Sequence, residues 1–372
     1  MRRMLVFLAA ALVFAGAARA AVPVPDARAF EVVNATTGEV LAARNAHERL
    51  PIASITKLMT VLVALQHLQP DQVVTVSAQA ARVGEERIPL HAGEQISVED
   101  LIEGALIQSA NDAADALASA AADGNVSRFV GWMNDRARQL GLRDTHFARP
   151  DGLDAPGHVS SAHDVAQLAQ VAMHSPLVRR VVRERAATIL DGTIPLHTWN
   201  DLLGVFPGLI GVKTGHTDQA GWCEVAAARR PGYTIYTVIL GSPTRGQRNA
   251  DLDRLLAWGV SRYRTLTLIA PRPYARVALP YGRTALPLVA TRPLRRVVHV
   301  GRPLVARVVA PTAIVLPVQR GARLGRIEIW AGRTLLGTRP LVAARSVDRP
   351  GLAGRLGWYA SHTIHDFADL FS

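Results

Sequence analysis

The chain has 372 residues, with 42 Lys and Arg against 30 Asp and Glu, and carries a formal net charge of +12. A length above roughly 250–300 residues favours two domains over one. A single cysteine, Cys223, excludes an internal disulfide framework, so the stability must come from the core. We expect Cys223 to be a small core residue; a reactive thiol is the alternative.

The first twenty residues have the pattern of a secretory signal peptide. Arg2 and Arg3 give a positive start, and a nearly unbroken apolar run follows from 4 to 18. The small-x-small sequence at 18–20 predicts cleavage, with residues 1–20 removed from the mature chain. A spanning helix needs about 20 apolar residues, so this run is too short to cross a bilayer comfortably. We therefore expect an exported protein; an uncleaved N-terminal anchor is the alternative.

Short strands and helices follow one another through residues 21–270. Residues 54–68 predict a helix that is apolar on all sides, as a buried central helix is. Ser97 has Asp100 three residues on, a variant of the capping box that begins a helix. The other elements that we expect are a hairpin of 30–34 and 40–43, helices at 112–122, 129–140 and 162–174, strands at 222–228 and 234–241, and a closing helix at 254–264.

Only two of the 42 basic residues are lysines, Lys57 and Lys213. Arginine stays protonated at any ordinary pH, whereas a buried lysine can lose its proton and act as a base. The two lysines are therefore candidates for chemistry, although two surviving lysines could also be chance. Their neighbours favour chemistry: Ser54 lies three residues before Lys57 and shares its helix face, and Thr214 and Gly215 follow Lys213.

Three elements occur in order along the chain: Ser54-x-x-Lys57, Ser109-x-Asn111 and Lys213-Thr214-Gly215. Each is weak alone, but the ordered set is the one that penicillin-binding proteins and class A β-lactamases carry. The chain resembles the low-molecular-mass penicillin-binding proteins, the serine D-alanyl-D-alanine carboxypeptidases, along essentially its whole mature length. Further stretches support the resemblance: 106–113, Asp151-Gly152-Leu153 with His158, and 211–217. Ala110 departs slightly from the family, which often has Gly there.

The chemistry assigns a role to each of the motif residues. A serine hydroxyl is a poor nucleophile at its own pKa, so Ser54 needs a base, and Lys57 can serve if burial and a second cation lower its pKa. Lys213 is the expected second cation and suits a substrate carboxylate. Ser109 can relay the proton to the leaving amine, and Asn111 can orient Lys57 or the substrate amide.

The resemblance also implies the substrate-binding residues. The backbone N–H of Ser54, at a helix start, suits half of an oxyanion hole, and the resemblance places the other half at His216. Gly215 lets substrate lie close along its strand. Thr214 and Arg248 are expected to hold the substrate carboxylate.

The resemblance and the pattern together predict an α+β fold. We expect a β-lactamase/DD-peptidase-like catalytic domain at 21–270, an antiparallel sheet flanked by helices. Short Val, Leu and Ile runs between Gly and Pro then predict a small all-β domain at 271–348. Residues 349–372 predict an amphipathic anchor helix, in which a mainly apolar set of residues follows helical spacing: Leu352, Leu356, Tyr359, Thr363, Phe367 and Leu370. A helix docked on the protein is the alternative.

The charge is concentrated in the β-rich part. Residues 272–349 contain fifteen Arg against Glu328 and Asp348. Export argues against nucleic acid as a partner, whereas an anionic membrane surface fits; a solvated arginine-rich face is the alternative. The resemblance implies a D-Ala-D-Ala stem peptide as substrate, β-lactam antibiotics as ligands, no cofactor, and a place in the periplasm on the outer face of the cytoplasmic membrane.

Several other functions compete with the carboxypeptidase. A serine β-lactamase shares the three motifs but deacylates with a loop Glu, and residues 146–161 contain no Glu. A D,D-endopeptidase would use the same residues. A non-catalytic protein that binds muropeptide or shapes the envelope is the third alternative. The twelve His residues show no paired metal-ligand spacing, so we expect no metal site.

Overall fold

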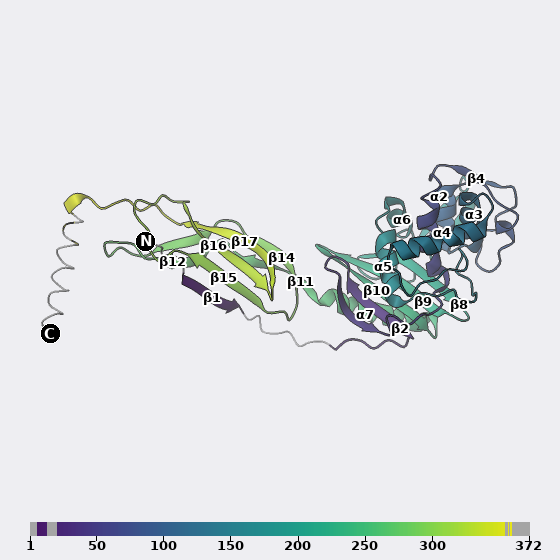
Figure 1. Cartoon of the computed structure of the whole chain (residues 1–372), viewed down its shortest axis with the longest axis horizontal. Coiled ribbons are helices and arrows are strands. Elements are labelled where there is room, and N and C mark those ends of the chain that lie inside the picture. Colours follow the sequence, from purple (N-terminus) through teal and green to yellow (C-terminus); the bar gives the residue numbers. More distant parts are fainter. Residues whose placement is uncertain (1–5, 13–20, 354–355, 357, 359–372) are drawn as a thin grey trace. The chain divides into compact units, whose positions relative to one another are not determined.

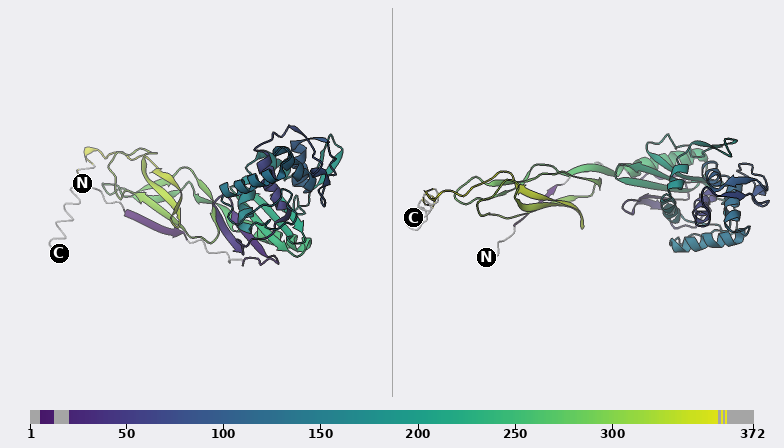
Figure 2. Two further views of the ribbon diagram at one scale, coloured as in Figure 1. Left: turned by 45° about the vertical axis from the view of Figure 1, so that its right-hand side comes forward. Right: turned by 90° about the horizontal axis from the view of Figure 1, so that it is seen from above.

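The computed structural model describes residues 6–12, 21–353, 356 and 358, and divides into two compact units, Ala20–Ser261 and a second formed by Met1–Arg19 with Arg262–Ser372. Helices gather around a sheet in the first unit, whereas the second consists almost entirely of strands (Figures 1 and 2). The predicted α+β class is confirmed. No helix in the described part of the chain has the length and apolar character needed to cross a membrane.

A five-stranded antiparallel sheet organises the first unit, in the order β3-β2-β10-β9-β8. Its strands are β2 (Ala29–Asn34), β3 (Glu39–Arg44), β8 (Leu209–Thr217), β9 (Gly221–Arg230) and β10 (Tyr233–Ser242). The sequence motif Lys213-Thr214-Gly215 lies on β8, which is an edge strand. An edge strand has backbone groups without a neighbouring strand, so β8 can pair with an extended ligand.

Helices cover both faces of this sheet. On β10, Tyr236 and Val238 belong to the large core cluster that also contains helix α1 (Lys57–Ala64) and helix α5 (Ala162–Ala172). On the opposite face, a side chain on Gly259 of α7 (Arg245–Ser261) would come within 2.9 Å of Ile235 and Val32. The remaining helical elements are η1 (Ala53–Thr56), η2 (Ala80–Arg82), α2 (Val98–Glu103), a π turn η3 (Gly104–Gln108), α3 (Asn111–Ala121), α4 (Val126–Gln139) and α6 (Pro176–Val181).

The closing helix of this unit differs from the prediction of 254–264, because α7 begins at Arg245 and ends at Ser261. The hydroxyl of Thr244 accepts a hydrogen bond from the backbone N–H of Gln247 at 3.1 Å. Thr244 with Gln247 three residues on has the spacing of a capping box. The early start places Arg248 on the first turn of a helix that packs against the sheet.

The second unit contains a six-stranded sheet in the order β1-β15-β16-β17-β13-β12 and a pair of strands, β11 and β14. The strand bounds are β1 (Val6–Leu12), β11 (Tyr263–Ile269), β12 (Pro273–Val277), β13 (Leu286–Ala290), β14 (Leu294–His299), β15 (Leu304–Ala310), β16 (Arg323–Ala331) and β17 (Thr334–Ala343). Their apolar faces enclose a separate core. The main part of this unit begins at Arg262, whereas the sequence predicted that the catalytic domain ends at residue 270.

Two predicted segments lie wholly or partly outside the described residues. Of the predicted signal peptide, residues 6–12 are described and form β1, which pairs antiparallel with β15. Of the predicted anchor helix, Leu352, Leu356 and Trp358 are described, and most of the remaining tail is outside the described residues. Both segments stay predictions.

Candidate active site

Ser54 and Lys57 lie one turn apart where η1 passes into α1. The Lys57 ammonium nitrogen Nζ donates to Ser54 Oγ at 2.7 Å, to Asn111 Oδ1 at 2.7 Å and to the backbone carbonyl of Asp151 at 2.6 Å. Ser54 is half-buried, whereas Lys57 is 0% exposed. A base thus lies within hydrogen-bond reach of the serine hydroxyl, the arrangement that an activated nucleophile requires.

Close backbone approaches position Ser54. Ala53, the residue before it, has a left-handed φ of +48°. A side chain on Gly215 of β8 would come within 2.9 Å of the Ser54 backbone nitrogen, and one on Gly152 within 2.2 Å of the Ala53 carbonyl oxygen. Only glycine fits at both positions, because a Cβ has no room there. The turn that carries Ser54 is therefore held between β8 and the loop at Gly152.

Ser109 and Asn111 come from the turn between η3 and α3. Ser109 has a left-handed φ of +68°, and Asn111 begins α3. The backbone N–H of Asn111 donates to the Glu86 carbonyl at 2.8 Å, and its side-chain amide donates to the Gly84 carbonyl at 3.0 Å. These two bonds fix the amide with its oxygen toward Lys57.

Lys213 approaches the site from β8 and is 2% exposed. Its Nζ donates to Ser109 Oγ at 2.8 Å and to the Thr214 carbonyl at 2.9 Å. The structure therefore brings the three sequence motifs together as two bonded groups beside one pocket: Lys57 with Ser54 and Asn111, and Lys213 with Ser109.

Burial changes the proton affinity of both lysines. It lowers the pKa of Lys57 to about 8, against the raising effect of the carboxylates of Asp151 and Asp115. Burial, together with the nearby charge of Lys57, also places the pKa of Lys213 well below its usual range. Lys57 can therefore be neutral near physiological pH and accept a proton, which an exposed lysine cannot do.

A pocket of about 250 Å³ opens beside Ser54. The predicted binding residues Thr214, Gly215, His216 and Arg248 all line it. Its other lining residues are Glu85, Glu86, Ser109, Asn111, Leu153, Trp199 and Trp222. All nine predicted site residues therefore either line this pocket or, as Lys57 and Lys213 do, bond to residues that line it.

Arg248 is a buried cation that already has partners within the protein. It is 1% exposed, and its Nε lies 3.1 Å from a carboxylate oxygen of Glu224 on β9. Its Nη2 donates to Asn249 Oδ1 at 2.6 Å and to Asp201 Oδ2 at 3.4 Å. Acidic groups therefore already surround the guanidinium that the resemblance assigns to the substrate carboxylate.

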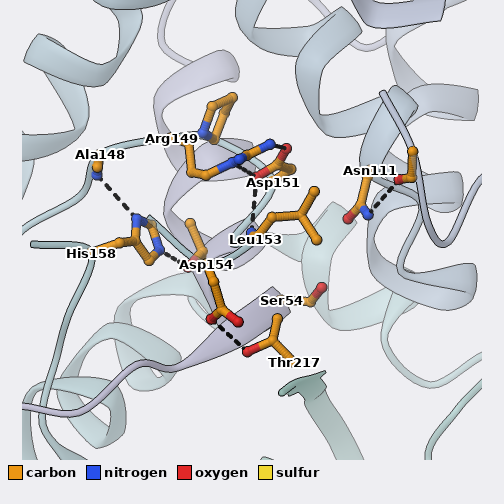
Figure 3. Close-up of polar contacts among 12 residues, drawn as sticks. Ser54, Asn111, Ala148, Arg149, Asp151, Leu153, Asp154, His158 and Thr217 are labelled. Atoms are coloured by element: carbon orange, nitrogen blue, oxygen red, sulfur yellow. Dashed lines mark hydrogen bonds and ion pairs between the residues drawn. The ribbon is translucent and has the colours of Figure 1, made fainter. Parts of the chain in front are cut away.

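The loop at 148–154 contributes Leu153 to the pocket wall and is held by several hydrogen bonds (Figure 3). Arg149 donates from Nε and Nη2 to the two oxygens of Asp151 at 2.5 and 2.6 Å, and the backbone N–H of Leu153 donates to Asp151 at 3.0 Å. Further along, Thr217 of β8 donates to Asp154 at 2.7 Å. These bonds hold Leu153 in the pocket wall.

His158 connects this loop to the turn η1. Its Nδ1 accepts from the Ala148 N–H at 3.0 Å (Figure 3). Its Nε2 therefore carries the proton and donates to the Thr56 hydroxyl at 2.8 Å. Burial lowers the pKa of His158 to about 4, so the ring is neutral at physiological pH and acts as a structural bridge.

Sequence reasoning missed three acidic or basic groups near the lysines. Arg149, Asp115 and Glu224 had been given no role. Asp115 had one detectable signal, because it lies four residues after Asn111 and so one helical turn along the same face. Burial and the neighbouring Asp151 raise the pKa of Asp115 to about 8. No group of His, Cys, Asp and Glu in the described ranges could hold a metal ion.

The sequence profile of one protein family, D-alanyl-D-alanine carboxypeptidase (Peptidase S11), matches residues 17–244. The chain is 31% identical to D-alanyl-D-alanine carboxypeptidase DacC of Escherichia coli, over 98% of this chain and 96% of that protein. It is similar to crystal structures of penicillin binding protein 5 from Haemophilus influenzae (26% identity, TM-score 0.65, 88% of this chain and 99% of that one). It is also similar to penicillin-binding protein D2 from Listeria monocytogenes in the ampicillin-bound form (32% identity, TM-score 0.58, 63% and 98%).

Proposed function

The chain belongs to the D-alanyl-D-alanine carboxypeptidase family, Peptidase S11, and from that premise we propose which of its residues perform the reaction. The protein is a serine hydrolase of the penicillin-binding type, and the alternative functions are not favoured. Its substrate class is the peptidoglycan stem peptide ending in D-Ala-D-Ala. The observation that carries the assignment of residues is the bond between Lys57 Nζ and Ser54 Oγ at 2.7 Å.

Acylation begins when neutral Lys57 removes the proton of the Ser54 hydroxyl. The Ser54 oxygen then attacks the carbonyl carbon of the D-Ala-D-Ala amide. The backbone N–H groups of Ser54 and His216 stabilise the negative oxygen of the tetrahedral intermediate, supported by the close approach of β8 to the Ser54 nitrogen. Asn111 holds Lys57 in place throughout.

Departure of the terminal D-alanine needs a proton on its amine. The proton that Lys57 took from Ser54 returns for this step: Ser109 Oγ, which accepts from Lys213 Nζ at 2.8 Å, gives its own proton to the leaving nitrogen and regains one from Lys57. The amide C–N bond breaks, D-alanine leaves, and an ester on Ser54 remains until water hydrolyses it. Thr214, Arg248 and Lys213 hold the terminal carboxylate, and the bound anion raises the pKa of Lys213 so that it is protonated in the complex.

Benzylpenicillin tests the nucleophile, because its acyl-enzyme keeps a covalent bond to the reacting serine. We expect intact-protein mass spectrometry to show one adduct per chain, and peptide mapping to place it on the peptide that contains Ser54. A slow return to the free mass fits a carboxypeptidase. An adduct on another serine would contradict the assignment, and fast hydrolysis of the drug would favour a β-lactamase.

We further propose that residues 1–20 are a secretory signal peptide, so that the enzyme works in the periplasm. The catalytic part is Ala20–Ser261, and the arginine-rich β unit with the tail places it at an anionic membrane surface. Apolar residues at helical spacing from Leu352 to Leu370 support the tail as the membrane-binding segment.

Deletion of residues 352–372 tests the tail. We expect the truncated protein to leave the membrane fraction while its soluble peptidase activity stays within about two-fold, since Ser54 and its partners lie in the other unit. Co-sedimentation with vesicles that contain anionic lipid measures this. Equal pelleting of full-length and truncated protein would refute the anchor.

A further inference from the structure

Glu224 is a buried acid on β9 that the proposed mechanism does not use. It is 0% exposed and lies directly opposite Thr214 of β8 in the strand register. Residues directly opposite each other share a face of the sheet. The next pair on this face is His216 and Trp222, whose ring centroids are 4.1 Å apart. The Glu224 carboxyl therefore lies beneath the part of the pocket assigned to the substrate carboxylate.

Arg248 of α7 lies against this face, where it approaches both the carboxylate of Glu224 and the ring of Trp222. Its Nε is 3.1 Å from Glu224 Oε2, and its guanidinium carbon is 5.7 Å from the centre of the Trp222 ring. Its hydrogen bonds to Asn249 and Asp201 also lie on Nε and Nη2. Nη1 has no hydrogen-bond partner among the described residues, and Arg248 lines the pocket with Ser54. Glu224 thus contacts the Nε edge of the guanidinium, and Nη1, on the other side of the group, remains for a ligand.

The charge of Glu224 can change under working conditions. Neither of its oxygens accepts a hydrogen bond from the described residues. Burial raises its pKa to about 7, against the attraction of Arg248; Asp201 raises it further, and Lys213 and Arg245 lower it. When Glu224 is protonated, the positive charge of Arg248 is offset by Asp201 alone, and when Glu224 ionises a second negative charge is added 3.1 Å from the guanidinium.

We propose that Glu224 is a positioning residue that fixes Arg248 at the pocket and weakens binding of the substrate carboxylate when it ionises. The inference rests on the proposed function, in which Arg248 and Thr214 bind that carboxylate. Because the substrate is an anion at every pH above about 5, any pH dependence of its binding near neutrality comes from ionisable groups of the protein, and Glu224 is the acid among them. KM should then rise with pH, while the chemical step, which depends on Lys57, follows its own pH dependence.

Steady-state kinetics on a peptide ending in D-Ala-D-Ala, between about pH 5.5 and 9, tests the proposal in the wild type and in Glu224→Gln. We expect the wild-type KM to rise about tenfold through neutral pH, as one added charge near the anion implies. In Glu224→Gln, which is neutral at every pH, KM should rise less through neutral pH than in the wild type, because only the contribution of Lys213 remains, and the kcat profile should keep its wild-type midpoint. Glu328→Gln, in the other unit, is the control and should keep the wild-type KM profile.

The outcomes separate this inference from the proposed function. A KM profile in Glu224→Gln that matches the wild type, or a flat wild-type profile, would overturn the role of Glu224 while leaving Ser54 chemistry intact. Absence of peptide hydrolysis and of a penicillin adduct in the wild type would instead overturn the proposed function. If Glu224→Gln does not fold, Glu224→Leu takes its place, because it removes the same charge with an apolar side chain.

Discussion

Replacing Ser54 with alanine is expected to abolish both peptide hydrolysis and the benzylpenicillin adduct. The loss in kcat should be at least about 10⁴-fold, because Ser54 is the hydroxyl that Lys57 Nζ contacts and removal of a nucleophilic serine costs a comparable or larger factor in other serine hydrolases. The fold should survive, since Lys57 Nζ keeps its bonds to Asn111 and to the Asp151 carbonyl.

Two measurements check this result. Circular dichroism melting of Ser54→Ala should stay within a few degrees of the wild type, and Ser127→Ala, an exposed serine on α4, should keep full activity and form the adduct. An adduct of normal stoichiometry on Ser54→Ala would show that the nucleophile lies elsewhere.

Replacing Lys57 with arginine is expected to reduce acylation about 10³-fold, the range that loss of a general base covers. Arginine retains the positive charge but stays protonated, so it cannot accept the Ser54 proton. The rate of benzylpenicillin acylation, measured by stopped-flow or by mass spectrometry over time, gives this number. A wild-type rate in a folded Lys57→Arg variant would exclude Lys57 as the base.

The wild-type pH profile provides an independent check of the same assignment. The pKa of Lys57 is about 8, and only the neutral amine can act as the base. Below that pH the amine is protonated, so the acylation rate should fall about tenfold for each unit of decreasing pH, and above it the rate should level off. Burial is the main cause of the low pKa, so a variant that admits water around Lys57 should move the midpoint upward.

Part of the proposed catalytic set could be predicted from the sequence, because the spacing of its residues is local. Ser54 and Lys57 are three residues apart on one turn, and Ser109 and Asn111 flank a single turn. What the sequence could not show is how distant segments meet. The bond from Lys57 to the Asp151 carbonyl joins residues 94 positions apart, and the register of β9 against β8 alone puts Glu224 opposite Thr214. No periodicity in the chain carries that information.

The ends of elements were also difficult to predict. Helix α7 begins at Arg245, nine residues before the predicted start, because Gly246 and Asn249 are weak helix formers that conceal the first turns. The local signal for this start was Thr244, whose hydroxyl accepts a hydrogen bond from the Gln247 N–H. Tyr263–Ile269 joins the β unit because it pairs with β14, in a register that runs from Tyr263 opposite His299 to Ile269 opposite Leu294.

The restriction of lysine to Lys57 and Lys213 has a practical consequence for spectroscopy and labelling. Both side chains are buried and bond to residues that line the pocket, so every side-chain amine of the protein belongs to the proposed active site. Isotope-labelled lysine should give a spectrum with two side-chain signals, and titrating them reads both proton affinities without mutation. Amine-selective reagents, which on most proteins report on the surface, would here react with the folded chain only at its N-terminus or when the active site opens.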